Sequence, residues 1–250
     1  MKKYLIPLIV CLLSMNIQLY SKEPQLIRIL LLSGRNNHEW KQTTPVLQNM
    51  FVKSGKFSIK TTERPDTLTS ADFLQTDVVL SNWNSWPEND LRWPEQTEKA
   101  LLNFIKNGGG FVTFHSSSSV FYKWPEFQEF TTAAWIMDST SHGKPSETNI
   151  SITNKTHPVT KDLNDFTVFD ELWLNAAENP KFEILGVASN KEISEKGIKP
   201  QPAIMASSFG KGRIFHTILG HDITAIDNSG FQSLLLRGTE WAATGKVLRK

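Results

Sequence analysis

Histidine is the residue type in this sequence best suited to chemistry, because a neutral imidazole can bind a metal or carry a proton near neutral pH. Three of the histidines follow apolar segments: His38 comes after ILLLSG, His115 ends FVTFH, and His221 follows TILG. If those segments are strands of one parallel sheet, their carboxyl ends meet at one edge, where ligands bind in open α/β sheets. The sequence therefore predicts that these three imidazoles gather in one hollow.

Two acids, Asp170 and Glu171 in FDELW, stand beside apolar strand residues. A carboxylate in such a setting must be paired, bound to a metal or shifted in pKa; a simple salt bridge is the alternative. We take His115, Glu171 and His38 as candidate catalytic residues, with Glu171 acting as a general base or as a metal ligand.

Histidines with a carboxylate suit a divalent metal such as zinc, iron or manganese. The candidate metal ligands are His115, His221 and His142, the last reaching the site from the loop SHGKP. The sequence lacks HExxH and short ligand spacings, so a proton relay through the same imidazoles stays open. No nucleotide-cofactor motif is evident.

Candidate substrate-binding residues are Trp83, Ser116 and Asp222. Trp83 belongs to a tryptophan-rich loop with Trp86 and Trp93, and indole rings at the edge of a sheet can stack on sugars. Ser116 opens a run of four serines that can supply hydroxyl or backbone contacts, or cap a helix. Asp222 can orient the neighbouring imidazole of His221.

The other two histidines are predicted to be structural. His216 lies inside a strand pattern, and His157 precedes a proline, which favours a turn.

Strands that alternate with helices are expected to position these residues. Apolar runs predict strands at 26–34, 57–63, 77–83 and 111–115, and capping and amphipathic patterns predict helices at 44–55, 67–76 and 94–110. Further strands are predicted at 165–174, 181–188, 202–208 and 212–219, and a closing helix at 230–245. This order predicts right-handed crossovers and a doubly wound, mostly parallel sheet. The Gly-rich turn at 207–213 predicts an antiparallel C-terminal hairpin.

The first 21 residues are expected to be a signal peptide rather than part of the fold. Lys2 and Lys3 precede an apolar stretch that is short for a membrane span, and cleavage after Ser21 is plausible. A retained anchor and, through Cys11, a lipoprotein are the alternatives. We expect residues 22–250 to form one exported domain, periplasmic or secreted, with no stable membrane span.

Charge and cysteine content exclude several functions for that domain. Cleavage would remove two of 27 basic residues and none of 25 acidic ones, so the net charge falls near zero and nucleic-acid binding has no electrostatic support. The only cysteine would be removed as well. Disulfides, thiolate metal sites and cysteine nucleophiles are then excluded. The sequence gives no oligomeric state.

Several stretches resemble the trehalose-utilisation, or ThuA-like, family. They include ILLLSGRNNHEW, GGGFVTFHSSSS, THPVTKDL, FDELWL, FGKGRIFHTILGHD and LLLRGTEWAATG, and they run from about residue 27 to 245. The resemblance implies an α/β fold like that of the class I glutamine amidotransferases, or more broadly flavodoxin-like. It carries His38, His115, Glu171 and His221, and less securely His142, over as motif positions.

The resemblance also implies a role in carbohydrate catabolism, with a small saccharide as partner. In amidotransferase-like relatives, the strand after such a glycine turn delivers a cysteine nucleophile, whereas this chain has His115. Amidotransferase chemistry is therefore not expected, and serine hydrolysis lacks G-x-S-x-G. We expect isomerase, hydratase, lyase or hydrolase chemistry on disaccharides or their 3-keto derivatives; a non-catalytic carbohydrate-binding or accessory protein is the alternative.

Overall fold

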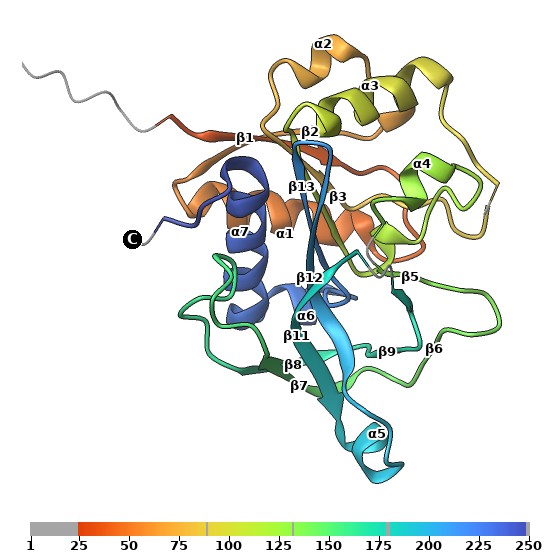
Figure 1. Ribbon diagram of the computed structural model, residues 1–250, viewed down its shortest axis with the longest axis vertical. Helices are drawn as coiled ribbons and strands as arrows, with labels where there is room; N and C mark the ends of the chain where they lie inside the picture. The colour runs from red at the N-terminus through yellow and green to blue at the C-terminus, as the bar shows by residue number, and fades with distance from the viewer. Residues whose placement is uncertain (1–24, 89, 132, 179–180, 249–250) are drawn as a thin grey trace, which may run out of the picture.

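A mixed sheet forms the centre of the computed structural model, which describes residues 25–88, 90–131, 133–178 and 181–248 (Figure 1). The predicted signal peptide at 1–21, with Cys11, lies outside the described residues. In order across the sheet, the nine strands of this part of the chain are β2 (Phe57–Thr62), β1 (Ile27–Leu32), β3 (Val78–Ser81), β4 (Gly110–Phe114), β13 (Gly212–Thr217), β12 (Gln201–Phe209), β11 (Glu183–Asn190), β7 (Ser146–Ile152) and β8 (Phe166–Asp170).

The sheet divides into a parallel half and an antiparallel half. Strands β2, β1, β3, β4 and β13 pair with their neighbours in parallel. From β13 through β12, β11 and β7 to β8, each neighbouring pair is antiparallel. The predicted α/β sheet with both strand orientations is thus present, and its antiparallel part continues beyond the β12–β13 pair to the edge strand β8.

Helices cover both faces of the parallel half. On one face, Ile29 and Leu31 of β1 pack in a core shared with α1 (Trp40–Lys53), α6 (Ile223–Ile226) and α7 (Ser229–Thr244). On the other, Leu30 and Leu32 join a core shared with α2 (Ser70–Phe73), α3 (Glu95–Lys106) and α4 (Pro125–Gln128). The continuous apolar run of β1 follows from this two-sided burial, because successive side chains of a strand point to opposite faces.

Two boundaries in the N-terminal half differ from the sequence prediction. Helix α1 begins at Trp40 rather than near Thr44, so Pro45 lies inside the helix instead of at its first position. Proline lacks an N–H, but so near the start of the helix it removes only an early hydrogen bond. The early start places His38 just before Glu39, the N-cap residue of the helix. The segment predicted as one helix at 67–76 contains a 3₁₀ turn, η1 (Pro65–Thr67), and the short helix α2.

The antiparallel half contains a strand, β7, where the sequence analysis predicts no element. In β7, Thr148, Ile150 and Ile152 are buried and alternate with exposed residues. This is the period-2 pattern of a strand with one wet face. The predicted strand 165–174 is also interrupted: β8 ends at Asp170, and β9 (Trp173–Leu174) starts a separate two-stranded sheet with β6 (Ser141–His142). The interruption puts Glu171 in the two-residue segment between β8 and β9.

The remaining short elements lie around the carboxyl ends of the parallel strands or along the antiparallel half. They are the 3₁₀ turn η2 (His115–Ser118), the paired strands β5 (Ala133–Ala134) and β10 (Ala177–Glu178), and α5 (Lys191–Glu195). Among the described residues, no helix is long and apolar enough to span a membrane.

Candidate active site

His115 stands on a strained turn where β4 ends. Its φ is +44°, in the left-handed region that residues other than glycine rarely adopt. The side chain is only 2 % exposed, and its Nδ1 lies 2.9 Å from the carbonyl oxygen of Ile218. Because a carbonyl only accepts, Nδ1 carries the proton and Nε2 presents a lone pair. Strain of this kind persists where the surroundings hold it, often at functional sites.

His38 presents its lone pair to the same point. Its Nδ1 lies 3.1 Å from Oδ1 of Asn36, an oxygen that also accepts from the backbone N–H of His38. Nδ1 therefore donates, and Nε2 lies 3.2 Å from Nε2 of His115. Burial, together with the nearby imidazoles of His221 and His142, lowers the pKa of His38 to about 4. Burial, with His38 beside it, also lowers the pKa of His115 well below its ordinary value.

His221 and Glu171 complete a cluster of four possible metal ligands. The ring of His221 lies 4.9 Å from that of His38 and 5.3 Å from that of His115, centroid to centroid. Glu171 is buried, with Oε1 3.7 Å from Nε2 of His115 and Oε2 3.6 Å from Nε2 of His221. One ligand atom from each of the four residues lies within 4.8 Å of all the others. This His/Glu cluster can hold a metal ion.

Asp170 ties the two backbone segments that carry His221 and Glu171. Its Oδ2 accepts from the N–H of Gly220 at 2.7 Å, and its Oδ1 accepts from the N–H groups of His221 and Glu171 at 3.1 and 2.8 Å. Burial raises the pKa of the Asp170 carboxyl to about 7, although the three N–H groups oppose the shift. Through this side chain the edge strand β8 reaches the loop after β13.

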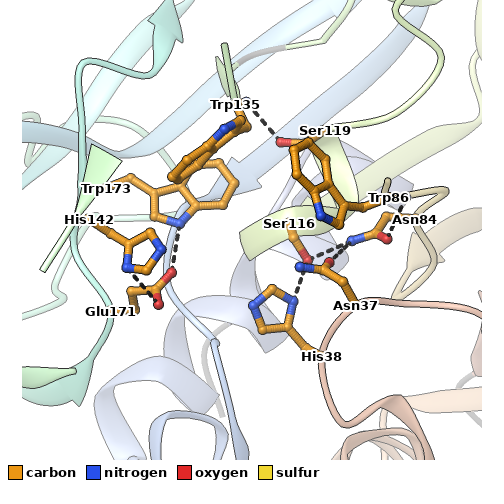
Figure 2. Close-up of a pocket in the computed structure, with 10 residues that line it drawn as sticks. All are labelled: Asn37, His38, Asn84, Trp86, Ser116, Ser119, Trp135, His142, Glu171 and Trp173. Atoms are coloured by element: carbon orange, nitrogen blue, oxygen red, sulfur yellow. Dashed lines mark hydrogen bonds and ion pairs between the residues drawn. The ribbon is translucent and has the colours of Figure 1, made fainter. Parts of the chain in front are cut away.

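A pocket of about 180 Å³ opens beside the cluster. Figure 2 shows Trp86, Asn84, Asn37, Ser116 and His38 on one side of it, and Trp135, Trp173, His142 and Glu171 on the other. The indole N–H of Trp173 lies 3.3 Å from Oε1 of Glu171. The arrangement combines aromatic surfaces, amide and hydroxyl groups, and a possible metal centre at one end.

Comparison with known proteins assigns the family. The sequence profile described as "ThuA: Trehalose utilisation" matches residues 28–242. This chain belongs to the ThuA family. A ThuA-like protein of Parabacteroides merdae ATCC 43184 is 31 % identical, with 90 % of this chain and 93 % of that one covered and a TM-score of 0.78.

A second ThuA-like structure, from Bacteroides uniformis ATCC 8492, is 19 % identical and has a TM-score of 0.70. The match covers 91 % of this chain and 96 % of that one, and at this identity it speaks for the fold alone. A search of curated proteins gave no match.

In this ThuA protein, His142 lies outside the four-residue cluster. His38 stands there as the third histidine, a position that the sequence analysis gave to His142. Strand β6 pairs His142 with Trp173, which sets the imidazole on the outer side of Glu171. Its Nδ1 is 3.0 Å from Oε2 of Glu171, and its side chain is 42 % exposed. His142 therefore contacts the carboxylate and the pocket rather than the other imidazoles.

Two of the three predicted substrate-binding residues do not line the pocket. Trp83 is only 5 % exposed and packs in the core against Trp93 and Phe121, because it follows the buried strand β3 directly. Asp222 caps helix α6 by accepting from the N–H of Ala225, although its other oxygen is 3.5 Å from Nδ1 of His221.

Ser116 does line the pocket, and its hydroxyl lies 3.0 Å from Nδ1 of His38. His216 is fully buried, and its Nδ1 is 2.8 Å from the hydroxyl of Thr113. His157 packs against Trp241, away from the histidine cluster.

The sequence analysis missed several residues that shape the pocket, namely Asn36, Asn37, Asn84, Trp135 and Trp173. A signal for three of them was available. Asn36 and Asn37 follow β1 and Asn84 follows β3, and polar residues after parallel strands share one edge of a sheet.

Proposed function

We propose that this protein is an exported enzyme of carbohydrate catabolism that acts on disaccharides or their 3-keto derivatives, with a divalent metal bound by His38, His115, His221 and Glu171. The close approach of these four ligand groups is the observation that carries the proposal. Family membership supplies the sugar, since the family is described by trehalose utilisation. Export depends on the predicted signal peptide.

The chemistry of the four groups fits a metal such as zinc, iron or manganese. Two imidazole lone pairs that face each other at 3.2 Å repel unless a cation or a proton lies between them. Lowered pKa values disfavour the proton. Asn36 and the carbonyl of Ile218 hold the other ring nitrogens, as partners of metal-bound histidines do.

A metal held there would polarise a sugar carbonyl or hydroxyl group. Glu171 borders the pocket and can accept a proton from the carbon next to such a carbonyl. Its Oε2 is 3.0 Å from His142, which keeps the carboxylate in place. A positioned base of this kind contributes typically ~10²–10⁴-fold. Whether the reaction is an isomerisation, a hydration, an elimination or a hydrolysis depends on whether a group leaves the carbon next to the one that loses the proton.

The test measures turnover of 3-keto-disaccharides together with metal content. We expect stoichiometric metal in the purified protein, its loss in His221→Ala, and a large loss of turnover in His115→Ala and Glu171→Ala. His157→Ala, at a histidine outside the cluster, is the control. Turnover in His115→Ala and Glu171→Ala equal to that of the parent protein would overturn the proposal.

A non-catalytic sugar-binding protein is the second candidate, and the tryptophans around the pocket favour it. Aromatic rings and amides bind sugars without any metal. A binder would hold saccharides in calorimetry with an affinity that chelators leave unchanged, and it would melt at the same temperature with and without chelator.

A further inference from the structure

We infer that the pocket beside the histidine cluster takes one neutral, unphosphorylated sugar ring, and that the rest of a disaccharide stays outside it. The inference narrows the substrate of the site in the proposed function and rests on that function. Its evidence is independent of the metal: the volume of the pocket, the rings on its two sides, the hydrogen-bonding groups it offers, and its charge.

The volume suits one ring rather than two. About 180 Å³ is below the ~300–1,000 Å³ typical of pockets for drug-sized ligands. An engineered cavity of about 150 Å³ takes one six-membered ring, benzene. A pyranose has one such ring, so about 180 Å³ suits a single pyranose. A second hexose would need as much space again, and it must therefore lie beyond the opening.

Indole rings stand on opposite sides of this volume. Figure 2 shows Trp86 across the pocket from Trp135 and Trp173. Trp173 is buried and fixed by its hydrogen bond to Glu171, and the ring of Trp135 packs against it with centroids 5.5 Å apart. Trp86 is half-buried. Flat apolar faces match the C–H faces of a pyranose, while the edges of the ring carry its hydroxyl groups.

Neutral donors and acceptors surround the rings. The amide nitrogen Nδ2 of Asn84 donates to Oδ1 of Asn37 at 2.6 Å and to the hydroxyl of Ser116 at 2.9 Å. The first bond fixes the orientation of the Asn37 amide and leaves its Nδ2 without a partner in the described part of the chain. That N–H₂ group lines the pocket and can donate to a sugar hydroxyl.

The charge of the pocket argues against a phosphorylated or acidic sugar. The ten residues that line it include no lysine or arginine, and the acidic one among them is Glu171. Phosphate and carboxylate groups are recognised through arginine, lysine or the N-terminus of a helix. A phosphate placed here would approach a carboxylate and find no cationic side chain.

The test is isothermal calorimetry with methyl α-glucopyranoside, trehalose and glucose 6-phosphate, on chelator-treated protein, so that a metal in the histidine cluster does not itself attract the phosphate. We expect the two neutral sugars to bind within about tenfold of each other, and glucose 6-phosphate at least about tenfold more weakly. Trp86→Ala should weaken both neutral sugars about tenfold, which corresponds to about 1.4 kcal/mol. Trp241→Ala, on α7 away from the pocket, is the matched control and should leave binding unchanged.

Three results would overturn the inference: equal binding of glucose 6-phosphate, trehalose binding more than about a hundredfold tighter than the methyl glucoside, or unchanged binding in Trp86→Ala. Turnover of 3-keto-disaccharides is measured separately. Protein that binds neutral single rings but never turns over keto-sugars would contradict the proposed function and leave the pocket inference standing. Turnover of keto-sugars with equal use of phosphorylated sugars would support the proposed function and contradict the pocket inference.

Discussion

The Nε2 atoms of His38 and His115 face each other at 3.2 Å, although the two residues come from different strand ends, 77 positions apart. In each ring the other nitrogen, Nδ1, faces an oxygen of the protein, and we therefore assign the ring proton to Nδ1. The two lone pairs thus converge without a proton to share. This contact makes the site a candidate metal centre rather than a group of histidines that satisfy one another.

Metal binding should raise the stability of the folded protein. A ligand that binds only the folded chain stabilises it by about 2.7 kcal/mol when its free concentration is a hundred times its dissociation constant. We expect Zn²⁺ or Mn²⁺ to raise the melting temperature of chelator-treated protein, and His38→Ala to abolish this rise. In His157→Ala the rise should persist. Equal rises in all three proteins would place the metal elsewhere.

Replacement of Asp170 should weaken the site and the fold together. In Asp170→Asn, an amide N–H₂ replaces one of two oxygens that accept from three backbone N–H groups, so at least one buried donor loses its partner. That loss costs about 1–3 kcal/mol of unfolding free energy. Metal affinity should fall by about 10–100-fold, as for other partners that orient metal ligands.

Asp165→Asn is the matched control, because Asp165 also accepts a backbone N–H, from Ile152 at 2.9 Å, but contacts none of the cluster. Urea unfolding and metal titration should show a loss of stability and of metal affinity in Asp170→Asn and neither loss in Asp165→Asn, because Asp165 is exposed and asparagine keeps an oxygen that can accept from Ile152. Unchanged metal affinity in Asp170→Asn would show that the hydrogen bonds of Asp170 have no role in positioning His221 and Glu171.

Gly220 should tolerate no side chain. Its φ is +106°, and a Cβ added there would lie 2.8 Å from Cδ2 of Phe114. In Gly55→Ala, by contrast, φ is +70° and the added Cβ meets nothing within 4 Å. We expect Gly55→Ala to lose about 1–2 kcal/mol from backbone strain alone. Gly220→Ala should lose more, about 2–4 kcal/mol, because overpacking adds to the strain. Equal losses in urea unfolding would contradict the predicted clash.

The free energy of unfolding should decrease as the pH is lowered below about 6.5, and His216 should account for part of this decrease. Burial lowers the pKa of His216 to about 3, compared with about 6.5 in an unfolded chain. Between these values the unfolded chain binds a proton that the folded one does not, so stability is lost as the pH falls through this window. His216→Gln should reduce the slope between pH 4 and 6 by about 1.4 kcal/mol per pH unit. If urea unfolding at several pH values gives the same slope in His216→Gln as in the parent protein, His216 binds a proton as readily in the folded chain as in the unfolded one.

The parallel half of the fold was predictable from local sequence patterns. The continuous apolar runs of β1, β3 and β4 predict strands that are buried on both faces, and the helical patterns after β1 and β3 predict crossover helices. Strand β7 was missed, although its alternation was visible. Its pairing with β11 and β8 depends on contacts far apart in the chain, which no local pattern specifies.

The pocket illustrates a finer limit. Trp83 and Trp86 stand three residues apart in one loop, and the sequence favours neither as the residue that lines the site. In the structure Trp83 continues the buried face of β3 into the core, whereas Trp86 borders the pocket. The direction of the loop after the strand decides between them.

The sequence by itself determined that His38, His115 and His221 share one edge of the sheet, because each follows a strand of the parallel half, and parallel strands end on the same side. Only the tertiary structure decided that Glu171 rather than Asp170 joins them and that His142 does not. Glu171 follows β8, at the far edge of the antiparallel half, and reaches the cluster through the Asp170 hydrogen bonds to Gly220 and His221. Such long-range bonds depend on how strands and helices pack against one another in three dimensions. Residue types and their spacing along the chain do not specify that packing.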